Sequence, residues 1–348
     1  MKRKLLLINL LLIFFMPNIS TAQGCMEAES DEGVSVKGFL QPQFDYTFDG
    51  ENNENTYKFN RARLGVVGNI PYDFSYYFIL EASPFKGGEG KVYLLDAFVS
   101  YSRFSFAKVS IGQFKSPFSL EQNTSCSGLH TINRSLVVNE LAGPIRELGL
   151  MIHGDIIKDK LKYKLAFMNG TGHGEIDDNS SKTIAGRVVI SPLKFISIGG
   201  SFKHGKNPPK ADGVEVEDET MRYAADLELK FGEFLIQGEY IFGQDKGSSI
   251  EGGGCGETPV TVVGDFKKSG YFMQAMYMLP FNLQPILKLE SYDADLDETE
   301  PNEKMITTFG FNYFFNDWTR LQLNYLYQAE KGHEVKNDML MLQIQVKF

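Results

Sequence analysis

The chain has 348 residues, of which 43% are hydrophobic and 23% charged, and its formal net charge is −9 at pH 7. This acidic balance argues against a nucleic-acid-binding protein, because such proteins are usually basic. The sequence has only three cysteines, which is too few for a disulfide framework, and whether Cys126 pairs with Cys255 depends on whether their loops meet.

The N-terminus has the pattern of a cleaved secretory signal peptide. Basic residues at positions 2–4 precede a short apolar run at positions 5–16, and small residues lead to a cleavage point after Ala22. The apolar run is too short to span a membrane as a helix. We therefore expect three parts, which are a signal peptide (1–22), a short periplasmic segment (23–33) and a folded domain (34–348).

Apolar and polar residues alternate along most of the remaining chain. The clearest stretch extends from Met221 to Phe231, and the same pattern ends the chain between Leu340 and Phe348. A period of two residues indicates a strand, because successive side chains of a strand point to opposite faces. These runs predict about sixteen strands, at residues 34–48, 56–68, 72–82, 91–102, 104–114, 145–154, 160–169, 182–191, 196–205, 220–231, 233–244, 267–279, 284–293, 303–315, 317–329 and 336–348.

The connections between these strands alternate between long and short. The long connections are expected at 116–144, 170–181, 205–219, 244–266 and 294–302, and the short ones at 69–72, 192–195, 232, 280–282 and 316–317. This rhythm is typical of a transmembrane barrel, with short periplasmic turns and long extracellular loops. A ring of this many strands is too wide for a packed core, so the apolar face must meet lipid and the polar face must line water. The predicted fold is therefore an all-β, closed antiparallel transmembrane barrel.

Four stretches resemble the phosphate-selective porin O and P family of Gram-negative outer membranes. They are Phe59-Asn-Arg-Ala-Arg-Leu-Gly65, Ile111-Gly-Gln-Phe-Lys-Ser-Pro-Phe-Ser-Leu-Glu121, Arg146-Glu-Leu-Gly149 and the terminal Phe348. The resemblance implies a trimeric pore in the bacterial outer membrane, surrounded by lipid and lipopolysaccharide. It also implies that loop 116–144 folds into the lumen as a constriction. Phe348 would be the signal that the barrel-assembly machinery reads.

Basic residues outnumber acidic ones at the positions that face the predicted lumen. A positive wall concentrates anions, and the guanidinium fork of arginine suits phosphate and carboxylate. Arg61 and Arg63 match the arginines that phosphate-selective members of the family place in the channel. The candidate pore-lining residues are Lys37, Arg61, Arg63, Lys115, Arg134, Arg146, Arg187, Arg222 and Arg320. Within the loop, the candidates for the narrowest point of the pore are Glu121 and three of these basic residues, Lys115, Arg134 and Arg146. By parity Arg146 would face lipid within a strand, so we expect it in the loop or at the rim.

A second interpretation of these charges is that they form ion pairs across strands and only keep the lumen hydrated. The sequence favours a porin for passive diffusion of small hydrophilic solutes, with a preference for phosphate or similar anions. The alternatives are a non-selective porin and a structural or partner-gated barrel. An enzyme is disfavoured, because His153 has no obvious nucleophile beside it. No cofactor or metal is expected, since the acidic stretch 293–297 lacks the glycine of a calcium loop.

Overall fold

The computed structural model describes residues 34–50, 53–70, 73–83, 91–177, 180–207, 218–251, 260–298, 302–331 and 335–348. The expected signal peptide, the segment 23–33 and Cys255 lie outside these residues, so the expected boundaries at Ala22 and residue 33 stay predictions. Within the described part of the chain, no helix is long and apolar enough to cross a membrane.

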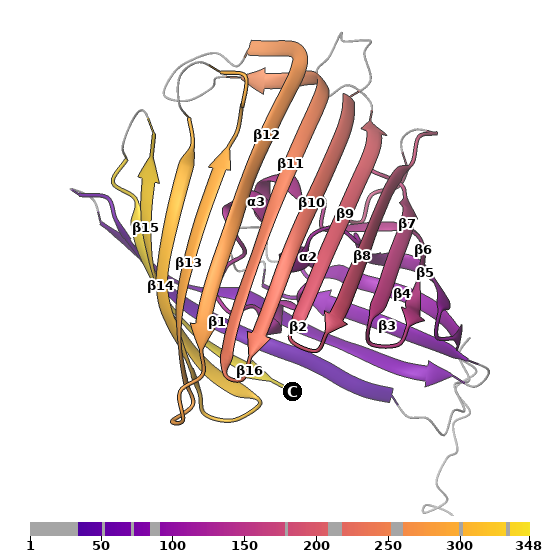
Figure 1. Cartoon of the computed structure of the whole chain (residues 1–348), viewed down its shortest axis with the longest axis horizontal. Coiled ribbons are helices and arrows are strands. Elements are labelled where there is room, and N and C mark those ends of the chain that lie inside the picture. The colour runs from indigo at the N-terminus through magenta and orange to yellow at the C-terminus, as the bar shows by residue number, and fades with distance from the viewer. Residues whose placement is uncertain are drawn as a thin grey trace, which may run out of the picture. The chain divides into compact units, whose positions relative to one another are not determined.

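The described residues form sixteen strands that close into one antiparallel barrel (Figure 1). Each strand pairs with its neighbours in sequence, and β1 closes the ring against β16, where Phe44 lies opposite Leu342. The strands are β1 (Val34–Phe48), β2 (Glu54–Ile70), β3 (Phe74–Glu81), β4 (Tyr93–Phe104), β5 (Ala107–Lys115), β6 (Arg146–Ile157), β7 (Leu161–Met168), β8 (Thr183–Leu193), β9 (Ile196–Asn207), β10 (Asp218–Phe231), β11 (Phe234–Glu251), β12 (Val260–Tyr277), β13 (Leu283–Asp293), β14 (Lys304–Phe314), β15 (Thr319–Glu330) and β16 (Asp338–Lys347).

The predicted fold class is confirmed, but one connection is shorter than expected. Strands β11 and β12 are 18 residues long and pair as far as Glu251 and Val260, so the expected loop 244–266 is mostly strand. Strands β3 and β7 have only 8 residues each. The wall is therefore tall at β11 and β12 (Figure 1), and β3 and β7 are its shortest strands.

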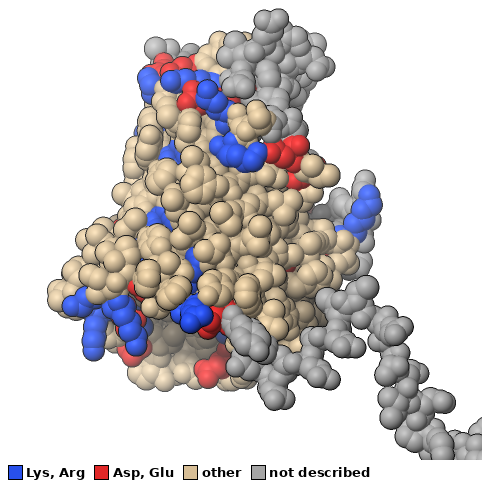
Figure 2. Space-filling model, turned by 90° about the vertical axis from the view of Figure 1, so that its right-hand side faces the viewer, with Lys and Arg blue, Asp and Glu red and all other residues tan. Residues whose placement is uncertain are grey.

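Burial along β16 shows which face of the wall points outward. The apolar residues Leu342, Ile344 and Val346 are 38–40% exposed, whereas Gln343 and Gln345 are 1% exposed. This inverts the order of a soluble protein, in which apolar side chains are inside. Figure 2 shows a largely uncharged belt on one outer face, with most Lys, Arg, Asp and Glu near its two ends. The apolar face of the wall is thus the outer one, as a barrel in lipid requires.

The third loop, residues 116–145, folds inside the ring. It contains α2 (Leu120–Asn123), a 3₁₀ turn (Cys126–Gly128) and α3 (Leu136–Leu141). Helix α3 buries Val137, Val138 and Leu141 against Ile241 of β11 and Phe272 of β12. This small apolar cluster fastens the loop to the tall side of the wall, and Figure 1 shows both helices within the barrel.

Candidate pore constriction

The third loop is hydrogen-bonded to strands around most of the ring. On the tall side, Glu239 of β11 accepts bonds from the backbone N–H groups of Leu120 (2.8 Å) and Glu121 (3.2 Å). Farther along the loop, side chains from other strands bind its backbone: Gln41 of β1, Arg61 of β2, Asn312 of β14, Gln322 and Asn324 of β15, and Gln345 of β16. The loop therefore crosses the lumen and narrows it.

Four cations from the wall and the loop surround Cys126. We call Arg61, Arg63, Lys115 and Arg134 the cation cluster. The Cys126 Sγ atom accepts hydrogen bonds from Arg63 Nη1 at 3.0 Å and Arg134 Nη2 at 3.3 Å. Burial alone would raise the pKa of this thiol, but the four positive charges lower the pKa well below its ordinary value.

The cation cluster has little carboxylate around it in the described residues. Arg63 Nε lies 2.7 Å from Glu81 Oε2. The other three cations bind neutral oxygens: Arg61 Nη1 donates to Gln41 Oε1 at 2.9 Å, Lys115 Nζ to the Thr124 carbonyl at 2.9 Å, and Arg134 Nη2 to the same carbonyl at 3.1 Å. The cluster thus keeps most of its positive charge.

A bulge in β2 turns the two arginines toward the lumen. Opposite β1, Gln41 pairs with Arg61 and Pro42 pairs with Phe59, so Asn60 is an extra residue. A bulge suits this place, because proline cannot donate a hydrogen bond to the ladder. Asn60 Nδ2 reaches Gln343 Oε1 in the lumen at 3.0 Å. The extra residue resets the alternation, so Arg61 and Arg63 lie on the same inner face as Asn60.

A cavity of about 770 Å³ adjoins the cation cluster and extends to Phe348. Lys37 and Arg146 line this cavity together with Arg63, Lys115 and Cys126.

The structure corrects the expected placement of Arg146 in the loop or at the rim. It is the first residue of β6, it is buried, and its guanidinium binds both oxygens of Asp96 at 2.8 and 3.1 Å. Lys115 is likewise the last residue of β5 rather than part of the loop.

The remaining predicted residues do not join the cluster. Arg187 forms a two-pronged pair with Asp226, and Arg222 Nη2 lies 2.6 Å from Asp245 Oδ1. Arg320 donates to Gln345 Oε1 at 3.0 Å. For Arg187 and Arg222 the geometry favours the second interpretation, that lumen charges pair across strands.

The pairing of strands brings together side chains whose contacts could not be predicted from the sequence. Ser110 Oγ lies 3.1 Å from His153 Nε2 and 2.6 Å from Ser100 Oγ. Ser110 is fully buried, however, so its hydroxyl is not accessible to a substrate.

Sequence reasoning also missed Cys126 as the centre of the cluster and Glu81 as the partner of Arg63. The described residues contain no group of three or more side chains suited to hold a metal ion.

Comparison with known proteins agrees with this geometry. The family model described as phosphate-selective porin O and P matches residues 36–229. No curated protein matches the sequence. Among solved structures, an anion-selective porin from Comamonas acidovorans is 14% identical, with a TM-score of 0.68, over 91% of this chain and 100% of that one. The trimer form of OmpT from Vibrio cholerae is 11% identical, with a TM-score of 0.66, over 92% and 100%. The outer-membrane channel DcaP of Acinetobacter baumannii is 13% identical, with a TM-score of 0.65, over 93% and 99%. At such identities these structures support the fold.

Proposed function

This chain belongs to the phosphate-selective porin O and P family and is a porin of the bacterial outer membrane, and we propose that it lets small anions diffuse passively through its lumen. Phosphate and small carboxylates are the solutes that its charges suit. Diffusion needs neither catalysis nor a cofactor, and we propose none.

The cation cluster is the observation that supports this preference. Arg61, Lys115 and Arg134 bind neutral oxygens, so their charge is available to a passing anion. The field of such charges is strong in a narrow passage with low-dielectric walls. The Comamonas porin, which has a similar fold, is described as anion-selective, and this agrees with the proposal.

The test is the reversal potential of the purified protein in a planar bilayer under a potassium chloride gradient, repeated with inorganic phosphate. We expect anion preference and a phosphate-dependent drop in current. Arg61→Met should lower the anion-to-cation permeability ratio by about threefold or more, because it removes a charge that no carboxylate balances. Arg103→Met is the matched control, because that side chain is 63% exposed at the end of β4.

The same measurement decides between the candidate functions. A wild-type channel that prefers cations, or whose current phosphate leaves unchanged, would contradict the proposal and favour a non-selective porin. A folded barrel without conductance would favour the structural or partner-gated alternative.

We further propose that the mature protein begins after Ala22 and assembles as a homotrimer. The proposal is supported by the description of one similar structure as a trimer, and the short strands β3 and β7 mark the side of the barrel where we expect neighbouring copies to pack. Phe348 would be read by the barrel-assembly machinery, and lipopolysaccharide would surround the outer rim. Mass spectrometry of the exported protein and light scattering in detergent test the cleavage point and the trimer.

A further inference from the structure

Lys288 of β13 differs from the cations of the cluster. Its side chain is fully buried, and its Nζ atom has partners within the protein. These are Glu121 Oε1 at 2.9 Å, Thr131 Oγ1 at 3.3 Å and Glu290 Oε1 at 3.4 Å. The ammonium also lies 5.2 Å from the centre of the Phe272 ring. Three acceptors match the three N–H groups of an ammonium, so Lys288 has none left for a solute.

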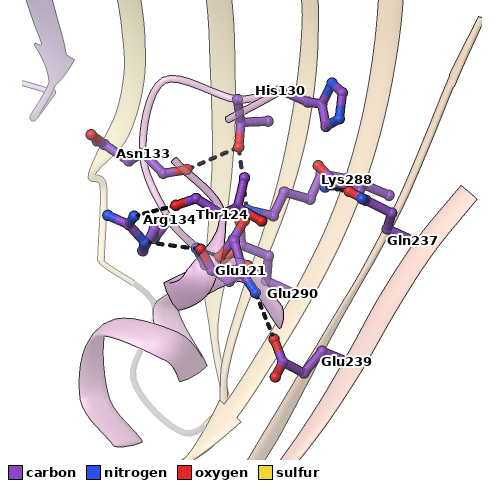
Figure 3. Close-up of polar contacts among 12 residues, drawn as sticks. Glu121, Thr124, His130, Asn133, Arg134, Gln237, Glu239, Lys288 and Glu290 are labelled. Carbon is purple, nitrogen blue, oxygen red and sulfur yellow. Dashed lines mark hydrogen bonds and ion pairs between the residues drawn. The ribbon is translucent and has the colours of Figure 1, made fainter. Parts of the chain in front are cut away.

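The two carboxylates around Lys288 hold the beginning of α3 as well. Glu121 Oε2 accepts the backbone N–H of Ser135 at 2.6 Å, and Glu290 Oε2 accepts that of Leu136 at 2.7 Å. We call Lys288, Glu121 and Glu290 the loop lock. Figure 3 shows the three side chains converging where the third loop meets the wall.

The loop lock ties distant points of the third loop to one strand. Through Glu121, Thr131 and the start of α3, it gathers residues 121 to 136 against β13. Arg134 lies between these attachments, and its Nε atom donates to the Glu121 carbonyl at 3.2 Å. The positions of Arg134 and Cys126 in the lumen therefore depend on the lock, although neither is one of the three acceptors around Lys288.

The charges of the lock make Lys288 its essential member. One ammonium lies between two carboxylates that are 3% and 8% exposed. Without it, two negative charges would stay buried side by side with no cation between them, which is strongly unfavourable. Protonation of one carboxylate would relieve this repulsion but would not restore the bonds that Lys288 makes to Glu121 and Thr131. Without those bonds Glu121 can move into water, and it would take the third loop with it.

We propose that Lys288 is a positioning residue that holds the third loop across the lumen, and that its loss releases the loop from β13. The inference goes beyond anion preference, because it concerns the width and steadiness of the passage for any ion.

The experiment uses the full-length protein with Cys25 and Cys255 replaced by serine, so that Cys126 reports on the loop. Cys126 is a free thiol and 2% exposed. In Lys288→Met, we expect a charged methanethiosulfonate reagent to modify Cys126 about tenfold faster, because the loop opens more often. Single channels in potassium chloride should become larger and noisier.

Two variants separate loop release from the loss of a lumen charge. Lys108→Met removes a lysine from the inner face of β5, opposite His153, and should leave the labelling rate and the current noise unchanged. Lys288→Arg keeps the charge and should restore most of the wild-type behaviour. The double variant Lys288→Met/Glu290→Gln buries one charge fewer, so it provides a folded barrel that still lacks the lock.

Folding is verified by the shift in gel mobility on heating. A folded Lys288→Met or double variant with the labelling rate and current noise of Lys108→Met would overturn the proposal. Failure of both to form barrels would also overturn it, since Lys288 would then serve barrel assembly. The labelling rate and the current noise do not depend on anion preference. The proposal about Lys288 can therefore fail while the proposed function holds, and the reverse is also true.

Discussion

Two regions of the lumen contain similar numbers of basic residues but use them differently. Near β2 and β5, the cation cluster meets carbonyl oxygens, one amide and one sulfur, with Glu81 as a nearby carboxylate. On β8 to β13, in contrast, basic residues have carboxylate partners: Arg187 binds Asp226, Lys203 binds Glu147, Arg222 binds Asp245, and Lys288 binds Glu121. We call these residues the paired region. A count of lumen charges therefore overstates the positive charge that a solute meets.

The comparison predicts that a cation of the paired region matters for stability rather than selectivity. Arg187→Met would leave Asp226 buried without its partner, since the two side chains are 7% and 4% exposed. We expect a loss of about 3–5 kcal/mol in the free energy of unfolding, measured as a lower midpoint in urea, with a smaller shift in the reversal potential than Arg61→Met gives.

The double variant Arg187→Met/Asp226→Leu is the control for this prediction. It removes both charges and should recover most of the lost stability, because no unpaired carboxylate stays buried. If Arg187→Met instead reduced anion preference as much as Arg61→Met does, Arg187 would lie in the path of the solute and the distinction between the two regions would fail.

A second prediction sharpens the comparison within the cluster. Glu81→Gln removes the carboxylate beside Arg63, and the new amide oxygen can still accept the N–H groups of Ala62 and Ser83. We expect the anion-to-cation permeability ratio to rise by about twofold, since one more cation becomes available. The reversal potential measures it. Glu228→Gln, at a carboxylate bound by Gln237, is the matched control, and an equal rise there would refute the prediction.

The smallest expected effect concerns the Cys126 thiol. Burial alone would raise the pKa of this thiol, but the neighbouring cations lower the pKa well below its ordinary value, so the thiolate fraction at a given pH exceeds that of an ordinary thiol. As long as the pH is below the pKa of an ordinary thiol, each rise of one pH unit increases its reaction rate about tenfold, because the thiolate fraction increases. With Cys25 and Cys255 replaced by serine, we expect the labelling rate of Cys126 to rise less steeply between about pH 6 and pH 8 than the rate of a thiol outside the cluster. Ser127→Cys combined with Cys126→Ser provides the comparison thiol. A tenfold slope at Cys126 would show that the cluster does not stabilise the anion.

The site was accessible to sequence reasoning only in part. Parity and family resemblance identified Arg61 and Arg63 as lumen residues, and the structure brings both together with Lys115 and Arg134. The role of Cys126 could not be found in this way, because its cation neighbours come from β2, β5 and the loop itself. The bulge at Asn60 was equally hidden, since it depends on the pairing of β2 with Pro42 of β1.

Alternation of apolar and polar residues, together with the rhythm of long and short connections, determined the barrel, its strand number and its orientation toward lipid. These are local properties, because each strand presents its faces by a period of two residues wherever it lies. The tertiary structure alone decided which lumen cations are neutralised. Arg63 and Glu81, Arg187 and Asp226, and Lys288 and Glu121 lie 18, 39 and 167 positions apart in the chain. Strand register and the path of the third loop bring these charges together, and neither can be read from parity.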